Sequence, residues 1–326
     1  MSLVMTSRQP PPTGHVTGRT LLFLLVSLLL PLLVVLPTRS VASEPELWSY
    51  RGWTPSLSLS IGMMSTGKVE GSVRSVDSTG VEIRPPDTGE DFATTPIATA
   101  SLGVDSPALE NVFQTPAFFV RATAIATIPI DRNVASEGAV GPFEIPDALT
   151  FTAPAITGQG SQTEISTNLL AYSFSAGLSI PVELAGHRFR VRPGVSWMRW
   201  ALDIRGDLHH AVKPAAFGSD FRAIDIHRHG KLYLNGIGPY LELESIEGTL
   251  ALTRSIAVGF FAEAGVYRVL GDRRANLGLE SSFDDAFGME TYTTQWSVEA
   301  DEWFYRFGAG VRIYLSSGIG RSGTSR

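Results

Sequence analysis

Residues 303–315 read Trp-Phe-Tyr-Arg-Phe-Gly-Ala-Gly-Val-Arg-Ile-Tyr-Leu, with an apolar residue at every odd position and Arg, Gly or an aromatic residue at every even position. This alternation predicts a β-strand, because successive side chains of a strand point to opposite faces. An apolar face opposite one that carries Arg306 and Arg312 is typical of a strand between lipid and the polar lumen of a barrel. The stretch therefore predicts an all-β transmembrane barrel.

Residues 1–42 have the pattern of an export signal peptide. Two arginines and no acidic residue precede the apolar run 21–36, and the small residues Ser40-Val41-Ala42 follow as a cleavage site. We expect the mature chain to begin near Ser43. The alternative, an inner-membrane anchor that is retained, is less favoured because Pro31 breaks the run.

The composition excludes several kinds of function. Removing residues 1–42 takes away three of the 26 basic residues and none of the 32 acidic ones, so the mature chain has a net charge of −9. A negative chain of this kind is not expected to bind nucleic acid. The absence of cysteine excludes disulfides, thiolate metal sites and a lipid-modified N-terminal cysteine. We expect no cofactor.

Alternating segments recur along the rest of the chain and predict one barrel domain, residues 43–315, followed by a Ser/Gly-rich tail, 316–326. The long polar segments 131–167, 206–231 and 271–291 predict extracellular loops, and the short links between other strands predict periplasmic turns. Residues 85–116 cannot be placed, and a hairpin hidden there would make ten strands instead of eight. The eight predicted strands are 55–65, 68–84, 117–130, 168–184, 188–205, 232–246, 252–270 and 300–315.

The strongest internal evidence is a predicted hairpin that turns at Ala185-Gly186. A two-residue turn there puts Glu183 opposite Arg188 on one face. The turn is inferred from two residues alone, so the match of both faces supports the register independently. On the other face the register pairs apolar residues throughout: Val182 with Phe189, Ile180 with Val191, Ala176 with Val195 and Phe174 with Trp197.

Beyond Trp197 the apolar residues change parity, beginning with Trp200. A single bulge near Met198 explains the change and brings Tyr172 opposite Trp200. Alternatively, the strand has no bulge and simply leaves the membrane. The sequence leaves both open.

The face opposite the apolar one is rich in charge and predicts a charged lumen. In an eight-stranded barrel the interior is filled by side chains, so these groups are expected to pair and close the lumen. The alternative is a narrow channel or a binding barrel for small anions or hydrophobic solutes, since the predicted lumen has three more positive than negative charges. The predicted network comprises Arg121, Glu183, Arg188, Arg190, Arg192, Arg199, Asp203, Arg205, Glu242, Glu244, Glu263, Arg306 and Arg312.

Other constellations give weaker signals. A loop with four histidines beside Asp207, Asp220 and Asp225 is a weak candidate for Zn²⁺ or Cu²⁺, and a solvated His-rich loop is the alternative. The only histidine near a predicted wall is His187, and no Gly-x-Ser-x-Gly elbow occurs, so no catalytic residues and no enzyme are predicted. The four histidines are His209, His210, His227 and His229. An aromatic stripe predicts an interface girdle with lipid contact: Trp197, Trp200, Trp303 and Tyr305.

The chain resembles the small outer-membrane β-barrels of Gram-negative bacteria, and in particular an uncharacterised group of them. The resemblance covers most of the mature chain and implies an outer-membrane location. One departure is that a Ser/Gly-rich tail follows Leu315, where family barrels often end on an aromatic residue. The segments that carry the resemblance are Ser136-Glu137-Gly138, Phe143-Glu144-Ile145-Pro146, Gly158-Gln159-Gly160-Ser161, Gly236-Ile237-Gly238-Pro239 and Leu270-Gly271-Asp272.

We therefore expect a monomer in the cell outer membrane, with membrane lipids and, during biogenesis, the barrel-assembly machinery as partners. An envelope-structural or surface-contact role follows from a plugged lumen. A soluble periplasmic sandwich or lipocalin-like barrel would bury the same apolar faces inward, and periodicity alone does not distinguish the two.

Overall fold

The computed structural model describes residues 52–77, 80, 87–109, 112–138, 156–212, 222–252, 256–285 and 288–315. The predicted signal peptide, residues 1–42, and the predicted tail, residues 316–326, lie outside the described residues. In the part of the chain that the structure describes, no helix is long and apolar enough to span a membrane.

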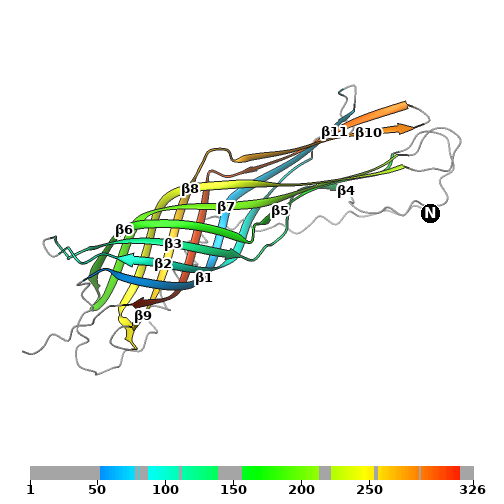
Figure 1. The fold of residues 1–326 in the computed structure, drawn as a ribbon. Helices are drawn as coiled ribbons and strands as arrows, with labels where there is room; N and C mark the ends of the chain where they lie inside the picture. Colours follow the sequence, from blue (N-terminus) through cyan, green and yellow to red (C-terminus); the bar gives the residue numbers. More distant parts are fainter. Residues whose placement is uncertain are drawn as a thin grey trace, which may run out of the picture. The chain divides into compact units, whose positions relative to one another are not determined.

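Eight antiparallel strands close into a ring, in the order β1-β12-β9-β8-β7-β6-β3-β2 and back to β1 (Figure 1). Each ring strand pairs with the ring strand that comes next in the sequence, and the last pairs with the first. The prediction of an eight-stranded antiparallel up-and-down barrel is therefore confirmed. The ring strands are β1 (Thr54–Asp77), β2 (Asp87–Asp105), β3 (Ala117–Thr127), β6 (Leu170–Leu184), β7 (His187–Val212), β8 (Arg222–Ala251), β9 (Ile256–Leu270) and β12 (Trp303–Leu315).

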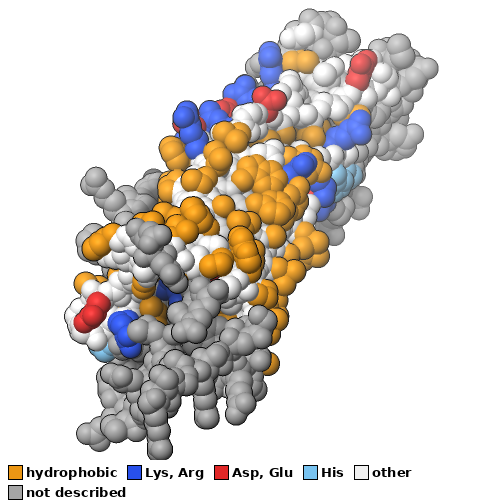
Figure 2. Space-filling view, turned by 60° about the vertical axis from the view of Figure 1, so that its left-hand side comes forward, with side chains coloured by type: hydrophobic (Ala, Val, Ile, Leu, Met, Phe, Trp, Pro, Cys, Tyr) orange, Lys and Arg blue, Asp and Glu red, His pale blue; other side chains and the backbone are white. Residues whose placement is uncertain are grey.

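The apolar faces of the ring strands point outward in the part that holds the turn at 185–186, where β8 also ends and β9 begins. Along β3 buried and exposed residues alternate strictly, so that Phe118 is 53% exposed while Arg121 is 3% exposed. Figure 2 shows hydrophobic side chains over most of the barrel wall that faces the viewer. Many of the charged side chains lie towards the upper end of the picture. This orientation is that of a transmembrane barrel and the reverse of a soluble one.

The predicted hairpin of β6 and β7 is confirmed residue by residue. Ala185 and Gly186 have φ of 53° and 78°, the positive values that a tight type I′ turn requires. Glu183 lies opposite Arg188, and Phe174 lies opposite Trp197. The remaining predicted pairs are also found: Val182 with Phe189, Ile180 with Val191 and Ala176 with Val195.

The first two predicted strands, 55–65 and 68–84, are wrong, because most of both belongs to β1. A register shift between Ser65 and Lys68 marks a bulge, which moves the buried positions from even to odd numbers. The second ring strand, β2, lies in the unplaced segment 85–116. Pro96 lies within it and two of its outward residues are Ala98 and Ala100, so its alternation is weak in the sequence.

Two further hairpins extend the ring at the end away from the turn at 185–186: β4 (Arg132–Gly138) with β5 (Ile156–Thr167), and β10 (Arg274–Asp285) with β11 (Gly288–Ala300). Strand β5 pairs with β7 beyond the end of β6, and β11 pairs with β1 beyond the end of β12. The result is two four-stranded sheets, β10-β11-β1-β2 and β4-β5-β7-β8, seen as two arms in Figure 1. We call this part the extension. The first of these hairpins and β10 occupy segments predicted only as loops, 131–167 and 271–291, whereas β11 continues beyond the second of them to Ala300.

The interior changes character along the barrel axis. An ionic layer fills the part near the turns, and an apolar layer fills the part next to the extension. In the apolar layer Phe304 stacks on Tyr267, with ring centroids 4.9 Å apart, and meets Trp200 edge-on at 5.8 Å. Its other buried members include Met64, Ile97, Ile125, Ile165, Met198, Leu202, Ile204, Leu232 and Leu234.

Strand β7 has no bulge near Met198. Tyr172 lies opposite Arg199, and the β7–β8 ladder continues without a register shift. The even-numbered residues of β7 therefore face inward both below and above this point, and Trp200, which is 1% exposed, belongs to the apolar layer. Its predicted role in the lipid-facing girdle is wrong, whereas Trp303 lies on the outer wall and is 39% exposed.

Candidate functional site: the ionic layer of the lumen

The ionic layer is built by inward-facing positions of all eight ring strands, which supply its charged groups, tyrosines and hydroxyls. These residues are buried because each strand places alternate side chains in the lumen. Strand β8 contributes the central carboxylates, Glu242 and Glu244, both 0% exposed. The guanidinium groups come from β3, β7 and β12: Arg121, Arg190, Arg192, Arg306 and Arg312.

Glu242 is the centre of the layer, because three guanidinium groups bind it. Arg192 Nη1 donates to Glu242 Oε1 at 2.6 Å, and Arg312 Nη2 donates to Oε2 at 2.8 Å. Arg121 Nη1 pairs with the same Oε2. The three guanidinium groups come from β3, β7 and β12. This one carboxylate of β8 therefore links four strands across the lumen.

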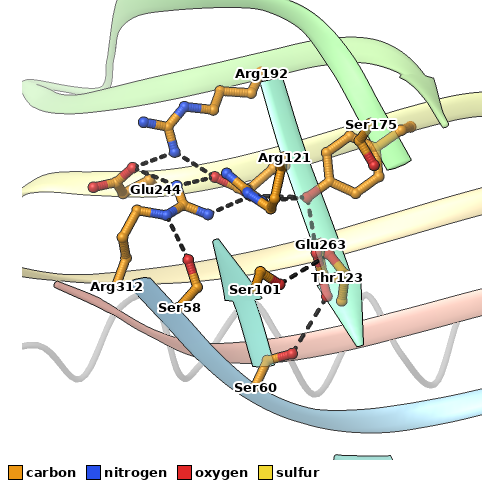
Figure 3. A network of polar contacts seen from close by, with 12 residues as sticks. Ser58, Ser60, Ser101, Arg121, Thr123, Ser175, Arg192, Glu244, Glu263 and Arg312 are labelled. Atoms are coloured by element: carbon orange, nitrogen blue, oxygen red, sulfur yellow. Dashed lines mark hydrogen bonds and ion pairs between the residues drawn. The ribbon is translucent and has the colours of Figure 1, made fainter. Parts of the chain in front are cut away.

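Glu244, two residues further along β8 towards its end at Ala251, forms a second centre. Arg192 Nη1 lies 2.8 Å from Glu244 Oε2, and Arg312 Nη1 lies 3.2 Å from it. The Tyr314 hydroxyl donates to Glu244, and Arg190 Nη1 lies 3.6 Å from Oε1. Figure 3 shows Arg192 and Arg312 approaching Glu244 from two sides.

A third branch is centred on Glu263 of β9. Arg306 Nη2 donates to Glu263 Oε2 at 3.0 Å, and the Tyr240 hydroxyl donates to the same oxygen at 2.8 Å. Ser60 Oγ donates to Oε1 at 3.3 Å (Figure 3). Since Tyr240 also accepts from Arg121 Nη1 at 2.8 Å, the three branches form one connected network.

Small hydroxyl residues line the wall between the charged groups. Ser101 and Thr123 lie 2.9 Å apart across β2 and β3, and Ser175 donates to Ser196 at 2.9 Å across β6 and β7. Arg192 Nε donates to Ser179 at 3.2 Å, and Arg312 Nε donates to Ser58 at 2.9 Å. Such partners satisfy guanidinium N–H groups that the carboxylates do not reach.

Burial makes this layer costly to disturb. Removing charges from water is unfavourable, and only close pairing and complete hydrogen bonding offset it. Loss of one partner therefore leaves other charges buried without compensation. The arrangement suits a rigid seal across the barrel.

The structure places the thirteen predicted lumen residues in three groups. Eight lie in the buried network: Arg121, Arg190, Arg192, Arg306, Arg312, Glu242, Glu244 and Glu263. Glu183 and Arg188 face each other at the open end of the barrel, where Glu183 is exposed.

Arg199, Asp203 and Arg205 are on the outer wall, which corrects their predicted place in the lumen. The Arg199 guanidinium lies over the Tyr233 ring at 4.8 Å, and Tyr233 is 49% exposed. Lys231 Nζ pairs with Asp203 at 3.1 Å, and their side chains are 46% and 40% exposed. They were assigned to the lumen because a bulge was placed before them, and β7 has none.

Besides the serines and threonines, the sequence pattern alone did not identify Asp105, Tyr240 and Tyr314 as members of the network. Asp105 Oδ2 lies 3.2 Å from Arg192 Nη2, and the Tyr314 hydroxyl accepts from the same nitrogen at 2.9 Å. Tyr314 shares the even-numbered face of β12 with Arg312, and Tyr240 shares that of β8 with Glu242, so parity was a usable signal. Asp105 ends β2, a strand that was not predicted.

The candidate metal ligands lie in the extension. The register puts His227 opposite Asp207, and His227 Nδ1 lies 2.6 Å from Asp207 Oδ1. His229 is opposite Arg205, and His209 is opposite Asp225; the side chains of His209 and His210 lie outside the described set. Among the described side chains, no group of three or more His, Cys, Asp or Glu residues could hold a metal ion.

No protein-family model matches this chain, and no curated protein matches it. Among solved structures, the chain is similar to the outer membrane protease OmpT from Escherichia coli, at 11% identity and a TM-score of 0.25, over 86% of this chain and 100% of that chain. It is also similar to Ail, the attachment invasion locus protein of Yersinia pestis, at 11% identity and a TM-score of 0.17, over 79% of this chain and 97% of that chain. A FadL homologue of Pseudomonas aeruginosa matches at 8% identity and a TM-score of 0.18, over 81% and 90%. Because these TM-scores are far below 0.5, we base no conclusion on them.

Proposed function

We propose that this chain is an outer-membrane β-barrel of a Gram-negative bacterium with a closed lumen, and that it serves envelope structure or surface contact through its extension. The turn at 185–186 would face the periplasm, and the extension would stand outside the cell, because such barrels have tight periplasmic turns and long external segments.

The observation that carries this proposal is that the lumen is filled by two different layers. In the ionic layer Arg192, Arg312 and Glu242 are completely buried. In the apolar layer Trp200 and Phe304 are at most 1% exposed. A solute would have to displace both sets of side chains, so the geometry favours a seal over a pore.

The outer wall supports the membrane location. Exposed large hydrophobic residues occur on ring strands all around the barrel, for example Leu59 on β1, Leu102 on β2 and Leu241 on β8. Aromatic residues among them, Tyr172 and Phe174, pack against Trp197 with ring centroids 5.7 and 5.9 Å away. An apolar wall with aromatic residues suits a bilayer and its interface.

The extension has the opposite character, which suits water and contact with other surfaces. Its outer wall carries charges in ion pairs, such as Lys68 with Glu70 at 2.9 Å. Its interior contains an apolar cluster, in which Trp296 packs beside Val73 and Leu208. A rigid, charged β-structure held above a sealed barrel is suited to contact rather than to transport.

Conductance of the refolded protein in planar bilayers tests the closed lumen. We expect no steady ion current from barrels whose insertion is verified by protection from protease. Steady current would contradict the proposal. Anion-selective current would support the alternative, a narrow channel for small anions.

Fractionation tests the location and detergent dependence. We expect the protein in the outer-membrane fraction, released only by detergent, and a protein–detergent complex that contains one chain. A protein that stays folded in plain buffer would contradict the membrane location. Within this proposal the chain has no catalytic role.

A further inference from the structure

Two guanidinium groups on the outer wall have no acidic partner among the residues that the structure describes. Arg199 of β7 contacts the Tyr233 ring at 4.8 Å and forms no ion pair, and Arg268 of β9 forms neither an ion pair nor a hydrogen bond. Lys231, on the same wall, does pair with an acidic residue, Asp203. An unpaired charge on a wall that meets lipid is unfavourable, so a partner from outside the chain is expected.

We propose that Arg199 and Arg268 bind the phosphate group of a lipid headgroup, in the leaflet on the side of the extension. The inference rests on the proposed membrane location. It is independent of the closed lumen and of the contact role of the extension.

The register of three strands brings the two arginines together. Asn235 of β8 lies opposite Arg199 in the β7–β8 ladder. Arg268 lies opposite Ile237 in the β8–β9 ladder, which makes it a diagonal neighbour of Asn235. Opposite side chains start about 5 Å apart and diagonal ones about 7–8 Å apart, within reach of long side chains. All three positions face outward, so the two guanidinium groups and the amide can meet one ligand.

The number of donors favours phosphate as the anion. Each guanidinium group presents a planar fork of N–H donors, and Asn235 adds an amide NH₂. A carboxylate has two oxygens and matches one fork, whereas a phosphate group has further oxygens for a second fork. The contact of Arg199 with the Tyr233 ring uses the face of the guanidinium group and leaves its N–H edge free.

The surrounding wall favours a lipid over free phosphate. Ile237 and Trp303 lie opposite Arg268 on its two sides and are exposed apolar residues. Towards the extension the wall continues with Tyr233 and Leu270, which are also exposed. Acyl chains packed on this wall would hold the headgroup at the two arginines, and aromatic residues are typical of this depth. Free phosphate would gain no such contacts.

The test is lipid binding by the refolded full barrel in uncharged detergent. Phosphatidylglycerol, whose phosphate gives it a net negative charge, and zwitterionic phosphatidylcholine with the same acyl chains are added in equal amounts. Native mass spectrometry counts the lipids that stay bound. We expect phosphatidylglycerol to be retained in preference. Equal retention of the two lipids would overturn the proposal.

Two double variants locate the effect. Arg199→Gln with Arg268→Gln should weaken the binding of phosphatidylglycerol about 10- to 30-fold and leave that of phosphatidylcholine unchanged. The matched control is Arg205→Gln with Arg274→Gln, which changes the net charge equally but removes exposed guanidinium groups that have acidic partners. It should weaken binding by less than about threefold. Equal losses in both double variants would show general attraction of charge and overturn the site.

Two competitors test the chemistry of the occupant. Neither inorganic phosphate nor oleate, a carboxylate with an acyl chain, should displace phosphatidylglycerol. Displacement by inorganic phosphate would overturn the lipid as occupant. Displacement by oleate would overturn the choice of phosphate over carboxylate.

Tryptophan fluorescence gives a second measurement on the same proteins. Phosphatidylglycerol with brominated acyl chains should quench the unmodified barrel more strongly than the Arg199 and Arg268 double variant, which keeps every tryptophan. Equal quenching would contradict a lipid held at this site. A barrel that needs detergent to stay folded but shows no preference for phosphatidylglycerol would contradict this inference and leave the membrane location intact.

Discussion

The same strands have ionic interiors near the turns and apolar interiors next to the extension. On β7 the inward residue is Arg192 in the first region and Leu202 in the second, both 0% exposed. On β8 the corresponding residues are Glu242 and Leu234. The inward face is continuous, and only its chemistry changes.

The proposed membrane location accounts for the change. A wall near the turns that meets lipid would have apolar residues outside and polar ones in the lumen. A wall in the extension that meets water would have charged residues outside, as Asp203 and Lys231 are, and an apolar cluster inside. One chain thus contains both arrangements, and a residue's polarity gives its face only when the surroundings are known.

Loss of the central carboxylate should lower the unfolding free energy more than any other change considered. Glu242→Gln leaves three buried guanidinium groups without their shared partner, and we expect a loss of about 3–5 kcal/mol in unfolding free energy. Unfolding by urea in micelles measures it. Glu183→Gln, at the exposed end of the barrel, is the control and should change little. Equal and small effects of both would show that the ionic layer is hydrated and not a seal.

A cavity in the apolar layer should have the next largest effect. Leu202→Ala is expected to lose about 2–4 kcal/mol, because Leu202 is fully buried and its neighbours close the space only in part. Leu241→Ala, on the lipid-facing wall at 51% exposure, should lose clearly less, since lipid chains replace the lost contacts. If the Leu241 variant were the less stable of the two, the assignment of inner and outer faces would be wrong.

In two strands the relation between apolar and inward-facing positions changes part-way along the strand, and these two changes show what a sequence can and cannot predict. In β1 the inward-facing positions change from even to odd because of a bulge between Ser65 and Lys68, at a place where the sequence pattern predicts a gap between two strands. In β7 the parity changes with no bulge, because the lumen becomes apolar at Trp200, and a bulge was one of the two readings left open. Both changes look alike in a single sequence. Only the partner strands distinguish them.

The hairpin of β6 and β7 was predictable because its two faces could be matched through one short turn. The hairpins β4–β5 and β10–β11 were not, since neither has a lipid-facing side and their polar residues resemble loop sequence. In the ionic layer, charge and parity were enough for Glu242 and Arg192. The mutual contacts of the network, including those of Tyr240, required the closure of the ring.

Close packing between the two sheets of the extension gives a third, smaller effect. A methyl group on Gly206 of β7 would lie 2.6 Å from the Trp296 ring of β11. Gly206→Ala should therefore lose about 1–3 kcal/mol by overpacking. Gly278→Ala is the control, because a methyl group there meets nothing within 4 Å. Equal stabilities of the two variants would show that the sheets do not pack at this point.

The smallest effect concerns the charged outer wall of the extension. Lys68 lies beyond the bulge of β1, and its pKa is raised by hydrogen bonds to Glu90 and Glu70. The pKa of Glu70 is lowered from 4.5, chiefly by the hydrogen bond from Lys68. Stability from Glu70 is thus present above pH 4.5 and lost as the pH falls through its lowered pKa. Stability from Lys68 is present below pH 10.5 and lost as the pH rises through its raised pKa.

Lys68→Met should therefore lower the unfolding midpoint slightly at neutral pH and not in strong acid, where Glu70 is protonated in both proteins. Because these side chains are exposed, high salt should remove the difference. Thermal unfolding of both proteins from pH 3 to 9, at low and at high salt, measures it. A difference that persists at high salt would mean that the wall is shielded from water, and that lipid reaches further along the barrel than the bulge of β1.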